Sequence, residues 1–124
     1  MTRTLLAAAL VAFSSVATAQ PVAVTLTEWK VELARDTVRA GLVTFRVKNG
    51  GAMAHAFHVV GQGVDKESRS IAVGQIENVT VTLKPGTYEV YCPMSEDSHK
   101  KAGMVHKVTV VEAAAPAPPK KPES

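Results

Sequence analysis

Apolar and polar residues alternate one by one over much of this chain, and this two-residue period constrains its fold more than any other feature. The segments 43–47 and 79–83 show it most clearly, with valine, phenylalanine or leucine at every second position. Successive side chains of a β-strand point to opposite faces, so this period predicts half-buried strands. No segment sustains the spacing of three to four residues that an amphipathic helix requires.

Short turn sequences separate the alternating segments. Asn49–Gly51 and Pro85–Gly86 are the strongest of them, and Arg39–Gly41 is another. About seven or eight short strands joined by such turns predict an all-β fold, an antiparallel Greek-key β-sandwich. The phase of the alternation slips near Glu28, which predicts a bulge or a kink. We expect strands at 22–26, 29–33, 43–47, 55–60, 70–73, 79–83, 87–92 and 104–111.

The two ends of the chain differ in composition from its middle. Residues 1–19 contain Arg3, a short apolar run and the small-residue sequence Ala17–Ala19, the pattern of a secretory signal peptide. The run is too short to span a membrane in the mature protein, although a retained anchor is the alternative. Residues 113–124 are mainly alanine, proline and lysine and predict a disordered tail. We therefore expect one exported domain at 20–112, located in the periplasm.

Charge and cysteine content narrow the possible functions. The 14 Lys and Arg residues against 11 Asp and Glu give a net charge of +3. These basic residues are scattered, which argues against a nucleic-acid surface. Cys92 is the only cysteine, so no internal disulfide can form. In an exported protein such a residue is a free thiol, an intermolecular bridge or a metal ligand.

The segment from 91 to 104 combines three kinds of metal-binding side chain. Cys92, His99 and Met104 offer a thiolate, an imidazole and a thioether. If the strands on either side of this segment pair as a hairpin, Cys92 and Met104 lie at the same end of the sandwich. His55, at the start of an expected strand, is the candidate for a second imidazole. Two histidines, one cysteine and a weak axial methionine form the ligand set of a blue-copper electron-transfer site.

Other residues of the same types remain alternatives. His58 could replace His55, although only His55 shares the strand face of Phe57. Met94 is an alternative thioether. His106 falls in phase with the inward-facing residues of the last expected strand, where a semi-buried structural histidine is the plainer interpretation. A buried inert thiol is the commoner explanation of a lone cysteine, but the nearby histidine and methionine favour a metal.

These motifs together resemble the cupredoxins, the small blue-copper proteins that include plastocyanin, azurin and pseudoazurin. The resemblance extends from about Val24 to Val111 and rests on the segments 47–51, 55–57, 85–88, 91–93 and 99–104. It implies a cupredoxin-like sandwich that holds one copper ion through His55, Cys92, His99 and, axially, Met104. It also implies that the Ala56 backbone N–H donates a hydrogen bond to the Cys92 sulfur.

The segment between Cys92 and His99 departs from the family pattern. It contains six residues, more than the short loops of the family, and it carries Glu96 and Asp97. Lys100 and Lys101 follow directly. These charges are either solvated loop residues or groups that steer a charged redox partner toward the metal.

The resemblance implies a function without substrate turnover. We expect a monomeric periplasmic carrier of single electrons that meets transient redox partners of the cytochrome or oxidase type. We expect it to bind no nucleic acid and to have no membrane span in its mature form. A copper-binding protein for storage, delivery or resistance is the alternative, because the same ligands would serve it. A metal-free adhesion module is a third possibility, and an enzyme is disfavoured because the chain is too short for a second copper site.

Overall fold

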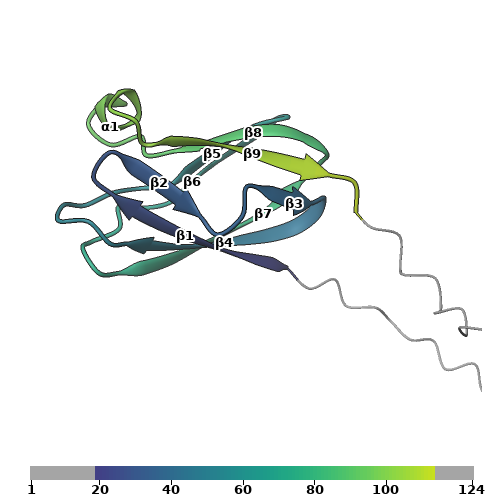
Figure 1. Cartoon of the computed structure of the whole chain (residues 1–124), viewed down its shortest axis with the longest axis horizontal. Coiled ribbons are helices and arrows are strands. Elements are labelled where there is room, and N and C mark those ends of the chain that lie inside the picture. Colours follow the sequence, from purple (N-terminus) through teal and green to yellow (C-terminus); the bar gives the residue numbers. More distant parts are fainter. Residues whose placement is uncertain (1–18, 114–124) are drawn as a thin grey trace, which may run out of the picture.

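The computed structural model describes residues 19–113, which form nine strands and one short helix (Figure 1). One sheet contains, in spatial order, β2 (Lys30–Leu33), β1 (Gln20–Thr27), β4 (Gly41–Asn49) and β7 (Ile76–Leu83). The other contains β3 (Thr37–Arg39), β9 (Val105–Val111), β8 (Gly86–Tyr91), β5 (His58–Gly61) and β6 (Val64–Glu67). The helix α1 (Ser98–Lys101) connects β8 to β9 at one end of the molecule (Figure 1). The predicted signal peptide (1–19) and tail (113–124) lie, except for Ala19 and Ala113, outside the described residues.

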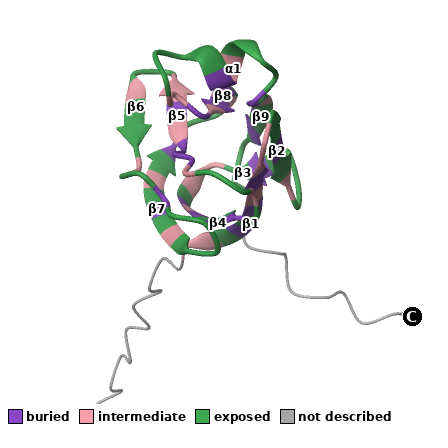
Figure 2. Cartoon of the chain, turned by 90° about the vertical axis from the view of Figure 1, so that its left-hand side faces the viewer, coloured by how far each residue is buried: buried purple, intermediate pink, exposed green. Residues whose placement is uncertain are grey.

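The two sheets pack face to face around an apolar core, which confirms the predicted Greek-key β-sandwich (Figure 2). The alternating residues Val43, Phe45 and Val47 are fully buried, as their period predicts. The rings of Phe45, from the first sheet, and Phe57, which precedes β5, lie 5.2 Å apart between centroids. Burying a side chain of this size contributes about 1.5–3 kcal/mol, and such burial is the dominant favourable term in folding. Between residues 19 and 113, no helix has the length and apolar character needed to cross a membrane.

Two strand pairings are parallel, although the sequence predicts an antiparallel sandwich. β1 pairs with β4 and β3 pairs with β9 in this way, and the other strand pairings are antiparallel. The reason is that β3, which follows β2 and precedes β4 in the sequence, belongs to the second sheet. The chain therefore leaves the first sheet after β2 and re-enters it beside β1, running in the same direction.

The phase slip near Glu28 is a tight hairpin turn, so the predicted bulge or kink is wrong. Thr27 pairs with Lys30 across it, which leaves Glu28 and Trp29 as the two turn residues. Trp29 has a φ of 63°. The positive φ falls only on the second turn residue, as in a type II turn and unlike the type I′ and II′ turns that are commonest in two-residue hairpins.

Two other expected strands differ from the structure, and one short helix was not expected. The strand expected from residue 55 begins at His58, and His55 itself forms only an isolated bridge with Ile71. No strand forms at 70–73, and the strand in this part of the chain is instead β6 (Val64–Glu67), which pairs with β5. The helix α1 was not predicted, because four residues are too few to produce a helical period.

Candidate metal centre

The hairpin of β8 and β9 places Cys92 and Met104 side by side. Cys92 N donates to Met104 O at 3.1 Å, and Met104 N donates to His99 O at 3.1 Å. The side chains of Cys92 and Met104 are fully buried. The prediction that the two residues lie at the same end of the sandwich is therefore confirmed.

The helix α1 directs His99 toward Cys92. Three successive residues before it, Ser95, Glu96 and Asp97, have φ values of 55°, 53° and 65°. Left-handed backbone costs about 1–2 kcal/mol per non-glycine residue, so the surrounding structure must hold these three residues in this conformation. The segment leads into the helix that carries His99, whose Nδ1 lies 3.6 Å from Cys92 Sγ.

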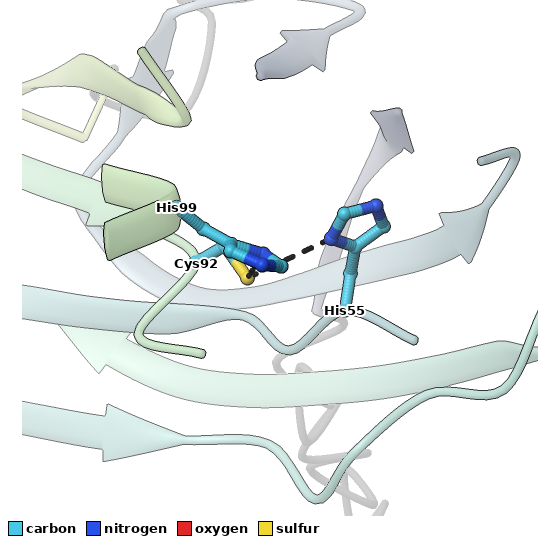
Figure 3. Close-up of side chains that lie close together, drawn as sticks. All are labelled: His55, Cys92 and His99. Carbon is cyan, nitrogen blue, oxygen red and sulfur yellow. Dashed lines mark hydrogen bonds between the residues drawn. The ribbon is translucent and has the colours of Figure 1, made fainter. Parts of the chain in front are cut away.

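His55 approaches the same sulfur from the segment between β4 and β5. Its Nδ1 lies 3.8 Å from Cys92 Sγ (Figure 3). The donor atoms of His55, Cys92 and His99 all lie within 4.8 Å of one another, and all three residues are buried. Within residues 19–113, this is the only group of three such side chains that could hold a metal ion. As predicted, the Ala56 backbone N–H donates to Cys92 Sγ, at 3.4 Å.

The chemistry of these donors fits copper. Thiolate and thioether sulfur favour Cu(I), and imidazole nitrogen is a good ligand for both oxidation states. His55 and His99 both present Nδ1 to the Cys92 sulfur, so the three donors converge on one region. Met104 is buried beside them, with its backbone bonded to both Cys92 and His99.

The alternative histidines do not join this group. His58 lies on the outer face of β5, where Nε2 contacts Asp65 and the ring lies 4.8 Å from the Tyr91 ring. His106 has a side chain 39% exposed, with Nε2 3.7 Å from Asp36 Oδ2. His106 is semi-buried, as its sequence interpretation has it: it shares the phase of the buried residues Met104 and Val108, but this part of β9 borders an open groove beside β2. Met94 is partly buried against the core and remains an alternative thioether.

Glu28 is a residue of the site that sequence reasoning missed. Its Oε1 lies 3.1 Å from His55 Nε2. The same oxygen accepts hydrogen bonds from Ala52 N at 2.7 Å and Met53 N at 3.2 Å. These bonds, that from Ala52 above all, lower the pKa of the Glu28 carboxyl. No motif could have indicated the contact, because 27 residues separate Glu28 from His55.

Trp29 is a second missed residue. Its ring stands edge-on to that of His99, and the two centroids lie 5.2 Å apart. His99 is only 6% exposed, whereas Trp29 is 48% exposed. Trp29 therefore covers the imidazole on the side that faces solvent. Glu28 and Trp29 together make the β1–β2 turn contact both histidines of the group.

Asn49 braces the segment that leads to His55. Its amide Nδ2 donates to Met53 O and to Ile71 O, each at 2.8 Å, and its Oδ1 accepts from Gly51 N at 2.9 Å. The residue is completely buried. The sequence indicates only a turn at this residue, because an Asn-Gly-Gly sequence is sufficient to explain a strand end.

Comparison with known proteins agrees with this geometry. A family model described as "Cupredoxin-like domain" matches residues 2–105. The chain belongs to this cupredoxin-like family. Together with the histidine–cysteine–histidine group, this membership identifies the cofactor of the protein as one copper ion. The search of curated proteins found no match to this cupredoxin.

Solved structures share the fold. Sodium-dithionite-reduced auracyanin from the photosynthetic bacterium Roseiflexus castenholzii has 17% identity and a TM-score of 0.60, over 77% of this chain and 99% of that one. Auracyanin A, a "blue" copper protein from the green thermophilic photosynthetic bacterium Chloroflexus aurantiacus, has 25% identity and a TM-score of 0.54, over 73% and 99%. A blue copper oxidase from Nitrosomonas europaea has 16% identity and a TM-score of 0.58, over 82% of this chain and 41% of that one.

Proposed function

We propose that this cupredoxin carries single electrons between redox partners through one type 1 copper site. His55, Cys92, His99 and Met104 would hold the ion. The convergence of a buried thiol and two imidazoles within 4.8 Å carries the proposal. When bound, copper supplies one-electron exchange between Cu(I) and Cu(II).

The residues around the donors suit this role. Cys92 is fully buried, so water and external thiols cannot reach its sulfur. The hydrogen bond from Ala56 N orients the sulfur and withdraws electron density from it, which is one way in which a protein tunes a reduction potential. Because Glu28 and Trp29 hold the two imidazoles from one turn, the donors keep their places when the charge of the site changes.

The composition of residues 1–19, which is that of a signal peptide, supports a role outside the cytoplasm. We assign residues 1–19 to a cleaved signal peptide, 20–112 to the copper domain and 113–124 to a tail, and we place the mature protein in the periplasm. It works as a monomer and not as an enzyme. The blue copper oxidase resembles it at 16% identity, which concerns the fold alone.

Redox partners are proposed to dock transiently at the α1 end. Trp29, at 48% exposure, is the side chain over His99 that such a partner would meet. Lys100 is less available for steering than expected, since its Nζ lies 2.6 Å from Glu89 Oε1 and 4.1 Å from the centre of the Tyr91 ring. Lys101 is exposed on the same helix.

Titration of the chain from residue 20 onward with Cu(II) tests the proposal. We expect an intense thiolate-to-copper absorption band and narrow copper hyperfine splitting in the EPR spectrum. Both signals should disappear in the variants Cys92→Ser and His55→Gln. The matched control His58→Gln should keep them, because His58 faces away from the group. A pale tetragonal Cu(II) spectrum in the unaltered protein would contradict the proposed site.

Redox cycling then separates the two roles that these ligands could serve. A carrier should cycle reversibly between Cu(I) and Cu(II) and exchange electrons rapidly with a small redox protein. Transfer of Cu(I) to an acceptor protein without reversible cycling would instead favour copper storage or delivery.

A further inference from the structure

The β1–β2 turn brings a carboxylate to the outer edge of the proposed copper site. Glu28 Oε1 lies 3.1 Å from His55 Nε2, the ring nitrogen opposite the one that faces Cys92. His55 is completely buried, whereas the Glu28 side chain is 31% exposed. The carboxylate therefore reaches inward from the surface to the far side of the imidazole.

The space around this contact accommodates the carboxylate closely. A Cβ atom added to Gly51 would lie 2.3 Å from Glu28 Oε1 and 3.0 Å from His55 Nε2. Only glycine leaves room there for both groups. Gly51 therefore does more than end a strand, because its lack of a side chain allows the Glu28 carboxylate to contact the His55 imidazole.

The same oxygen is held from a second direction. The backbone N–H groups of Ala52 and Met53 both donate to Oε1, at 2.7 and 3.2 Å. These two bonds fix the carboxylate on the segment that carries His55. Glu28 Oε1 is therefore preorganised by three donors, which are Ala52 N, Met53 N and His55 Nε2.

This arrangement determines which nitrogen of His55 carries the proton. A carboxylate oxygen can only accept a hydrogen bond, so the proton must lie on Nε2. Nδ1 then keeps a free electron pair directed at the region beside Cys92 Sγ, 3.8 Å away. Outer carboxylates of this kind orient metal-binding histidines and make them stronger donors.

We propose that Glu28 is a positioning residue of the copper site, which holds His55 as the Nε2–H tautomer and supplies a negative charge that favours Cu(II) over Cu(I). The inference rests on the proposed function. It adds a fifth side chain that acts on the metal through His55 and does not touch it.

Three variants separate the charge of Glu28 from its hydrogen bond. Glu28→Gln keeps the size and an acceptor oxygen but removes the charge, and Glu28→Ala removes both. Glu32→Gln removes the same charge from the same hairpin at an exposed position, where the carboxylate contacts Lys30, and is the matched control. Thermal unfolding of each variant checks that the fold is retained.

The reduction potential and the copper affinity are the first measurements. We expect Glu28→Gln to lower the ratio of Cu(II) to Cu(I) affinity by about 3- to 10-fold, where tenfold raises a one-electron potential by about 59 mV. Glu28→Ala should also weaken Cu(II) binding by about 10- to 100-fold. Glu32→Gln should leave both quantities within about twofold, since its charge is exposed and screened.

The tautomer of His55 is measured without copper, from the ¹⁵N shifts of its ring in the apoprotein at pH 8. We expect Nε2–H in the unaltered protein and a mixture of tautomers in Glu28→Ala. A predominant Nδ1–H tautomer, or identical potentials for Glu28→Gln and Glu32→Gln, would overturn the inference. Absence of the thiolate-to-copper band in the unaltered protein would instead overturn the proposed function, and the ¹⁵N measurement would still decide whether Glu28 holds His55.

Discussion

The ring of Trp29 stands at 88° to the ring of His99, with the two centroids 5.2 Å apart. This contact joins a turn of the first sheet to the helix between β8 and β9. Nearby, Gly103 has a φ of 120°, and a Cβ there would lie 3.0 Å from the backbone oxygen of Trp29, so glycine suits this position. An exposed aromatic ring thus covers a proposed copper ligand that is itself almost inaccessible to solvent.

Copper loading should quench the fluorescence of this protein strongly. Trp29 is the only tryptophan, so all tryptophan emission reports on the ring beside His99. We expect a loss of more than half of the emission at one equivalent of Cu(II), measured by steady-state fluorescence. Cys92→Ser is the control, and equal quenching in that variant would show that copper reaches Trp29 without the proposed site.

Met104 and Met94 should respond differently to the same substitution. Met104→Leu removes the thioether but conserves volume, so the cost in folding free energy should stay below about 1.5 kcal/mol. We expect the reduction potential to rise, because a sulfur donor that interacts with the copper is lost, while the thiolate-to-copper band persists. Voltammetry of Met104→Leu beside Met94→Leu makes the comparison. A shift confined to Met94→Leu would assign the axial position to Met94.

Replacement of Asn49 should destabilise the fold and loosen the segment that carries His55. Asn49→Ala removes a buried side chain that bonds Met53 O, Ile71 O and Gly51 N. Buried groups left unpaired cost about 1–3 kcal/mol each, partly relieved by water, so we expect a loss of about 2–4 kcal/mol in unfolding free energy. Urea denaturation of the apoprotein measures it. Asn78→Ala, at an exposed position of β7, is the control and should change stability by less than about 0.5 kcal/mol.

Sequence patterns predicted those parts of the site that depend on local periodicity. His55 and Phe57 are both buried as predicted, although Ala56 between them is buried too and the strand begins only at His58. Cys92 and Met104 meet because the strands beside them form a hairpin, and hairpins join neighbouring segments. His106 shares the phase of the core residues, but it is only semi-buried because its place borders an open groove, which periodicity alone does not reveal.

The sequence by itself determined the sandwich, the side-chain types of the candidate site and the end of the molecule at which they gather, because alternation and turn chemistry act between near neighbours. Only the tertiary structure decided what surrounds the proposed ligands. Glu28 and Trp29 reach His55 and His99 because the β1–β2 turn packs against segments far away in the chain. Such contacts depend on how two sheets dock, and docking is a property of the whole core that no single segment encodes.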